Sequence, residues 1–157
     1  MSITVRPARR EELERVNELR RMVNDVHVNG RPDIFRPGFG QELQDYVYTL
    51  FDADEARILV AVLDESIVGY AVAKVIHRPL SPYNLERSYY HVEEFGVDER
   101  YRRRGAATAL IAYMKNEAKT LGLDKVELDV WAFNGDALAF YEAVGFTTYR
   151  RYMEMNV

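Results

Sequence analysis

The stretch Val97–Leu110, VDERYRRRGAATAL, joins two different residue patterns and decides the fold of the chain. Before it, YYHVEEFGV (residues 89–97) is rich in aromatic and β-branched side chains, which predicts a strand. After it, apolar residues recur at helical spacing from Ala107 to Leu121, and Gly122 ends the pattern. The sequence therefore predicts a strand, a short arginine-rich turn with a glycine at the join, and a helix.

The arginine-rich turn has the chemistry of an anion-binding site. A helix N-terminus offers free backbone N–H groups and the positive end of the dipole. Gly105, followed by the small Ala106 and Ala107, lets an anionic group approach the backbone, and arginines can add charge-assisted contacts. The turn thus indicates a phosphate or pyrophosphate cradle. The alternative is a solvated basic loop, because the spacing matches neither the dinucleotide fingerprint nor the P-loop.

The rest of the chain predicts further strands and helices without an internal repeat. Before the turn, the expected elements are a strand at residues 2–8, helices from Glu11 and over 41–51, and a hairpin of 57–63 with 67–77. After the helix that follows the turn, they are a strand at 125–131, a helix capped by Asn134 and a final strand from Phe146. The order β-αα-βββ-α-β-α-β predicts a single α/β domain over residues 1–157.

Composition and charge narrow the class of protein. A chain of 157 residues with 48% hydrophobic residues has the size and core of one domain. Its net charge of −4 argues against a nucleic-acid partner or an acidic membrane partner. The lack of cysteine excludes disulfides, thiolate metal sites and an acyl-cysteine intermediate. No apolar run is long enough to span a bilayer. We expect a cytoplasmic protein without a metal.

Three blocks of the sequence resemble the GNAT superfamily of acyl-CoA-dependent N-acetyltransferases. The family signature Q/R-x-x-G-x-G/A, at a strand–loop–helix junction, is matched by Arg102, Gly105 and Ala107. VWAFNGDALAFYEAVGF (residues 130–146) is similar to the later motif, in which an Asn opens a helix carrying an Ala, an aromatic pair and then Gly-Phe. HVEEFGVDERYR (residues 91–102) is similar to the central strand and its loop. The resemblance extends over nearly the whole chain.

This resemblance implies a mixed, mainly antiparallel GNAT-like sheet with a splayed central strand and acetyl-CoA as co-substrate. Strand backbone would pair with the pantetheine, loop amides would hold the pyrophosphate, and strand N–H groups would polarise the thioester carbonyl. Gly96 would mark the bulge that opens the cleft. The expected acetyl-CoA contacts are Phe95, Gly96 and Val97 in the strand, Arg102, Arg103, Arg104, Gly105, Ala106, Ala107 and Thr108 in the turn, and Asn134 and Ala137 in the later helix.

The resemblance also suggests catalytic residues, because acetyl transfer needs a base for the protonated amine and an acid for the thiolate. Glu93 and His91 align with general bases of the family, and we favour Glu93, directly or through a water. The alternatives are a cross-strand ion pair for Glu93 and a half-buried ring for His91. Tyr141 matches the tyrosine acid, or is a packed core residue. Strand alternation places Tyr89, His91, Glu93, Phe95 and Val97 on one face and Glu94, expected to be structural, on the other.

The acceptor is expected between the loops 29–40 and 77–90, which flank the cleft in the family. Asp33 and Glu86 would attract a cationic amine, while Phe35 and Tyr83 would form an apolar wall. We expect direct transfer to a small-molecule primary amine in a ternary complex. Acetylation of a protein N-terminus or lysine, and a non-catalytic acyl-CoA sensor, are the alternatives. The terminal strand also allows pairing in a homodimer.

Overall fold

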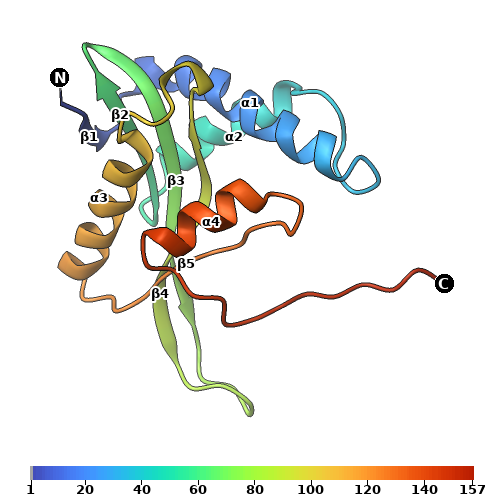
Figure 1. The fold of residues 1–157 in the computed structure, drawn as a ribbon. Helices are drawn as coiled ribbons and strands as arrows, with labels where there is room; N and C mark the ends of the chain where they lie inside the picture. The colour runs from blue at the N-terminus through green and yellow to red at the C-terminus, as the bar shows by residue number, and fades with distance from the viewer. Residues whose placement is uncertain (1) are drawn as a thin grey trace.

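A five-stranded sheet in the order β1-β2-β3-β4-β5 forms the centre of the computed structural model, which describes residues 2–157 (Figure 1). Neighbouring strands are antiparallel except for the last pair, β4 and β5, which is parallel. The elements are β1 (Thr4–Pro7), a short 3-10 helix (Arg10–Glu12), α1 (Leu13–Gly30), α2 (Gln41–Phe51), β2 (Ala56–Leu63), β3 (Ser66–Arg78), β4 (Arg87–Val97), a second 3-10 helix (Glu99–Tyr101), α3 (Ala106–Thr120), β5 (Val126–Leu128) and α4 (Gly135–Ala143). The predicted GNAT-like α/β fold is confirmed.

Helices cover both faces of the sheet, so the middle strands are apolar on both sides. Along β2, Ile58 and Val60 pack with α1 and α2, whereas Leu59 and Ala61 pack with α3. Figure 1 shows α3 on one side of the sheet and α1 with α2 on the other. This double coverage explains why RILVAVL is a continuous apolar run rather than an alternating one.

A β-bulge at Glu93 interrupts the ladder between β3 and β4. Val72 pairs with Glu94 and Ala73 pairs with Val92, so Glu93 is an extra residue without a partner in β3. The prediction that Gly96 marks the bulge is wrong, because Gly96 pairs regularly with Tyr70. The extra residue reverses the alternation of side chains for the remainder of the strand.

The bulge places two consecutive glutamates on the same face. Val92 and, past the bulge, Phe95 both pack in the core under α3. Glu93 and Glu94 both contact the opposite layer, through Tyr46 of α2 and Arg20 of α1 respectively. The prediction that Glu93 shares a face with Phe95, and that Glu94 lies on the other face, is therefore wrong.

The central strand β4 separates from β5 at the same point. The two strands pair only as far as Val92 with Leu128. The Asp98 N–H donates to Val68 O of β3 at 2.8 Å, and bonds alternate along an antiparallel pair, so Phe95 and Val97 direct their N–H groups away from β3. These N–H groups border the gap that opens between β4 and β5, as expected for a splayed central strand.

The terminal segment, residues 146–157, lacks the predicted strand. It runs out as an extended trace after α4 (Figure 1) and is tied down by contacts of Tyr149 with Glu127 and of Glu154 with Arg31, the latter at 2.7 Å. Aromatic and β-branched composition predicted a strand, but a strand also needs an edge to pair with, and β5 offers three residues. Within residues 2–157, no helix combines the length and apolarity needed to cross a membrane.

Candidate active site

The arginine–glycine turn forms a small cavity at the start of α3. Gly105 precedes the helix with a φ of 90°, in the left-handed region that glycine tolerates best. The first helical bond runs from Ala109 N–H to Gly105 O at 2.9 Å, so the N–H groups of Ala106, Ala107 and Thr108 have no helical acceptor. The cavity has a volume of about 280 Å³, and its lining residues are Val97, Tyr101, Arg102, Arg103, Gly105, Ala106, Ala107, Thr108 and Phe140.

This cavity brings together most of the predicted cofactor residues. Arg102 and Arg103 line it with their neighbours, whereas Arg104 lies with its guanidinium 5.6 Å from the centre of the Tyr101 ring. The Ala106 methyl group is buried in the core under α3. The free backbone N–H groups at the start of α3, more than the side chains of the three arginines, therefore remain the predicted anion-binding groups.

A buried carboxylate anchors the turn to the rest of the molecule. Asp98 accepts a hydrogen bond from the Arg100 N–H at 3.0 Å, and its other oxygen accepts from the side chains of Arg100 and Arg15 at 2.8 and 2.9 Å. The hydrogen bond from Arg100 is the main reason that the pKa of Asp98 lies well below its usual value. The carboxylate thus stays charged and fixes the turn against α1.

Aromatic side chains of α4 cover the gap beside β4. The Phe95 ring stacks on Phe140 at 6.1 Å and lies 6.0 Å from Tyr141, which also meets Phe146. Burial raises the pKa of Tyr141 to about 12, so its hydroxyl remains a proton donor at neutral pH.

The start of α4 agrees with the predicted cap. Asn134 Oδ1 accepts a hydrogen bond from the Ala137 N–H at 3.3 Å and thereby caps the helix. The capping interaction orients the helix that carries Tyr141. A contact of either residue with acetyl-CoA stays a prediction.

Glu93 belongs to a three-residue polar cluster. The Tyr46 hydroxyl donates to Glu93 Oε1 at 2.5 Å, and Lys74 Nζ lies 3.1 Å from Glu93 Oε2 and 3.0 Å from the Tyr46 oxygen. The cross-strand ion pair, considered above as the alternative interpretation of Glu93, is therefore present. Tyr46 and Lys74 were missed by sequence reasoning. Only the position of Lys74 in the strand next to Glu93 could have indicated its role.

Glu94 is held in a separate, more buried network. Arg20, whose side chain is 3% exposed, donates to the two oxygens of Glu94 at 3.0 and 3.2 Å and to Asn17 Oδ1 at 2.8 Å. The Tyr70 hydroxyl donates to Glu94 Oε1 at 3.1 Å. This arrangement agrees with the structural role expected for Glu94.

His91 lies next to the Glu93 cluster. It is opposite Lys74 in the ladder of β3 and β4, so the two side chains share a face of the sheet. Its ring centre is 6.3 Å from that of Tyr89. His91 is half-buried, as the alternative interpretation of this residue predicts.

Two of the predicted acceptor residues lie in the loop after α1. Phe35 meets His27 and Trp131, with ring centres 5.2 and 5.0 Å apart. Asp33 accepts two hydrogen bonds from Arg31, both at 2.9 Å. This loop therefore contacts the segment between β5 and α4, on the side of the gap.

The other two predicted acceptor residues lie elsewhere. Tyr83 is 94% exposed at the tip of the β3–β4 hairpin, and Glu86 pairs with His77 at 3.1 Å. Figure 1 shows this tip and the loop after α1 at separate ends of the molecule. The structure does not join the four residues into one site, because β3 and β4 stay paired out to Arg78 and Arg87 and carry the tip away.

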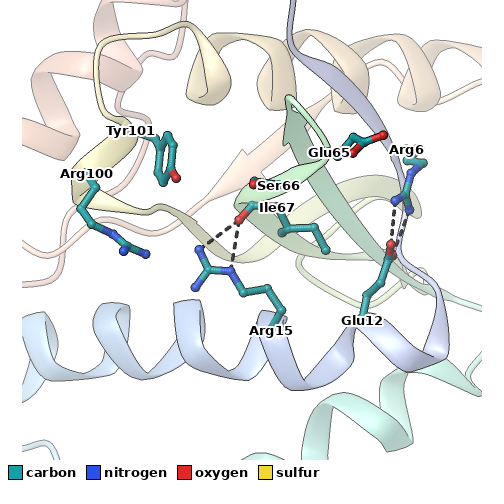
Figure 2. A pocket seen from close by; sticks show the side chains of 8 residues that line it. All are labelled: Arg6, Glu12, Arg15, Glu65, Ser66, Ile67, Arg100 and Tyr101. Carbon is teal, nitrogen blue, oxygen red and sulfur yellow. Dashed lines mark hydrogen bonds and ion pairs between the residues drawn. The ribbon is translucent and has the colours of Figure 1, made fainter.

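A second pocket, of about 450 Å³, lies between α1 and the β2–β3 turn (Figure 2). Its lining residues are Arg6, Glu12, Arg15, Glu65, Ser66, Ile67, Arg100 and Tyr101. Figure 2 shows Arg6 paired with Glu12 and Arg15 donating to the Ile67 carbonyl oxygen, at 3.0 and 3.1 Å. The guanidinium groups of Arg6, Arg15 and Arg100 already bind acceptors within the protein, so the pocket offers few free donors to an anion.

A mixed sheet splayed at its central strand, with a glycine-opened turn at the end of the gap, defines an acetyltransferase fold. The chain belongs to the acetyltransferase (GNAT) family, whose family model matches residues 23–146. It is 36% identical over 100 residues to the L-amino acid N-acetyltransferase AaaT of Escherichia coli K12, covering 62% of this chain and 57% of that protein.

Three further proteins are similar to more of the chain. An N-alpha-acetyltransferase of Saccharolobus solfataricus is 28% identical over 148 residues, covering 91% of this chain and 79% of that protein. The crystal structure of a tetramutant of the BH1408 protein from Bacillus halodurans superposes with a TM-score of 0.93 at 27% identity, covering 98% and 99% of the two chains. The aminoglycoside enzyme AAC(6')-Iy, bound to a bisubstrate analogue of CoA, shares the fold with a TM-score of 0.79 at 20% identity, over 100% of this chain and 99% of its own.

Proposed function

We propose that the protein is an N-acetyltransferase that moves the acetyl group of acetyl-CoA directly to a primary amine in a ternary complex. The observation that carries this proposal is the glycine-opened turn, with its free helix N–H groups, at the end of the gap between β4 and β5. The residues fit the co-substrate: the turn presents the N-terminal N–H groups of α3 to a cavity of about 280 Å³, and a Cβ added at Gly105 would meet no atom within 4 Å. A pyrophosphate fits such a site.

The acetyl thioester is the reactive group that the co-substrate supplies. The N–H groups of Phe95 and Val97 border the gap and would orient and polarise the thioester carbonyl. Glu93 would accept the proton of the acceptor ammonium, directly or through a water, so that the amine can attack. The N–C bond forms as the C–S bond breaks, and Tyr141, kept protonated by its pKa of about 12, would donate a proton to the departing sulfur.

We favour a small-molecule amine as the acceptor. The relative in Escherichia coli is named an L-amino acid N-acetyltransferase, and a relative in Arabidopsis thaliana is named an L-ornithine N5-acetyltransferase. Acetylation of a protein N-terminus or lysine is the second candidate, because other relatives are named N-alpha-acetyltransferase or ribosomal protein bS18-alanine N-acetyltransferase. A non-catalytic acyl-CoA sensor is the third.

Two measurements test the proposal. Acetyl-CoA should raise the melting temperature of the purified protein, because a ligand of the folded state stabilises it. A panel of amino acids, diamines and peptides should then release free CoA thiol. Stabilisation without thiol release from any amine would favour a sensor. If acetyl-CoA neither stabilises the protein nor releases thiol with any amine, the acetyltransferase proposal is contradicted.

A further inference from the structure

We propose that the acceptor is a free α-amino acid, whose ammonium binds Glu93 and whose carboxylate binds Lys74. This inference rests on the proposed acetyltransferase function and specifies its substrate class. Glu93 and Lys74 carry opposite charges, lie 3.1 Å apart, and have side chains that are 27% and 31% exposed. They are therefore within reach of a small ligand.

The balance of charge around Glu93 favours a zwitterion over a polycation. The negative charge of Glu93 is matched by Lys74, and that of the neighbouring Glu94 is matched by the buried Arg20. A diamine or an aminoglycoside would gain most from uncompensated carboxylates, and these two carboxylates already have cationic partners. An acceptor with one positive and one negative group leaves the site neutral and each charge paired.

The separation of the two side chains fits an α-amino acid. In such a molecule the ammonium and the carboxylate are attached to the same carbon, so their charged atoms lie close together. Inserting it between Glu93 and Lys74 would replace one internal ion pair with two intermolecular pairs. The Tyr46 hydroxyl contacts both side chains and would hold Glu93 in place while Lys74 turns to the ligand. Tyr46 is a positioning residue in this scheme.

The location of the pair fits the chemistry of transfer. Glu93 is the bulge residue at which β5 leaves β4, and Phe95, whose N–H borders the gap, is two residues further on. Two strand residues span roughly 7 Å, which places an amine held by Glu93 near a thioester carbonyl held at Phe95. The pair thus lies at the acceptor end of the gap, opposite the end formed by the turn before α3.

The test compares an α-amino acid with its α-amide, which keeps the amine and side chain but lacks the carboxylate. Wild-type kcat/KM should be about 10-fold to 100-fold higher for the acid, as expected for hydrogen bonds to a charged group. Lys74→Gln should lower kcat/KM for both substrates, because Lys74 also contacts Glu93, but it should remove the preference by raising KM for the acid more than for the amide. Lys115→Gln, an exposed lysine of α3, is the matched control and should keep the preference.

The outcomes distinguish failure of the proposed zwitterion site from failure of the acetyltransferase function. Equal wild-type rates for acid and amide, or better rates for diamines or peptides, would overturn the zwitterion site and leave the acetyltransferase function intact. An equal loss on both substrates in Lys74→Gln would also overturn it, because Lys74 would then act only through Glu93. If Lys74→Gln fails to fold, the wild-type comparison of acid with amide decides. Absence of transfer to every amine would instead contradict the acetyltransferase function itself.

Discussion

Replacing Arg20 with Met should destabilise the protein far more than its single charge suggests. The side chain is 3% exposed and donates to both Glu94 oxygens, to Asn17 Oδ1 and to the Leu43 carbonyl oxygen. Breaking a buried ion pair from one side costs about 3 to 5 kcal/mol. The Glu94 side chain is 22% exposed and keeps the hydrogen bond from the Tyr70 hydroxyl, so we expect the free energy of unfolding to fall by about 3 kcal/mol, at the lower end of that range.

Urea denaturation followed by circular dichroism measures this loss. With a slope of about 2 kcal/mol per molar urea, the midpoint should fall by about 1.5 M. Glu94→Leu should also destabilise, and the double variant should cost less than the sum of the two, because no unpaired charge is left buried. Lys119→Met, at an exposed position of α3, is the control and should change stability by less than about 0.5 kcal/mol.

The same experiment separates the two neighbouring glutamates. Glu93→Gln should lower turnover with little change in the midpoint, because the Glu93 side chain is 27% exposed and its ion pair is accessible to water. Glu94→Gln should mainly lower the midpoint. If Arg20→Met unfolds at the wild-type urea concentration, or if its effect and that of Glu94→Leu simply add, the ion pair does not hold α1 against β4 as described.

Three further predictions concern the turn, the tyrosine and the terminal segment. Tyr141→Phe should lower kcat at least about 100-fold. Because a pKa of about 12 keeps Tyr141 protonated, the shape of the kcat profile between pH 7 and 10 should be the same in the variant and the wild type. Loss of an alkaline decline in the variant would contradict the assignment. Gly105→Val places a β-branched residue at a φ of 90°, which distorts the turn. Calorimetry should therefore show acetyl-CoA binding weakened by more than about 10-fold in Gly105→Val and by less than about threefold in Arg103→Ala. Similar affinities in the two folded variants would contradict the predicted phosphate cradle. The sequence allows a homodimer through the terminal segment; such a dimer should be visible by light scattering and be lost when residues 147–157 are removed, and a full-length monomer would exclude it.

Much of the fold was predictable because its signals are local. Helical spacing identified α1 and α3, apolar runs identified β2 and β3, and the glycine and asparagine at the helix starts placed the caps. The arginine–glycine turn was found for the same reason, since the groups that form it are consecutive in the chain.

The features that sequence reasoning missed depend on pairing between distant segments. The bulge at Glu93 exists only relative to the register of β3, so the alternation read along β4 alone gave the wrong faces. Tyr46 and Lys74 meet Glu93 from α2 and β3, and nothing in their own surroundings marks them. The separation of Tyr83 from Phe35 follows from the length of a hairpin, which loop composition does not indicate.

The extra residue at position 93 has a consequence for insertions and deletions. Deleting Glu93 would restore an unbroken ladder between β3 and β4, so the strand itself would lose little. The side chains beyond it would keep their faces, because Val92 and Glu94 already pair with the consecutive residues Ala73 and Val72. The deletion would remove the carboxylate that contacts Tyr46 and Lys74. Deleting Glu93 should therefore affect the site much as exchanging the glutamate does, whereas deleting a regularly paired residue of β4 would move every side chain beyond it to the other face of the sheet.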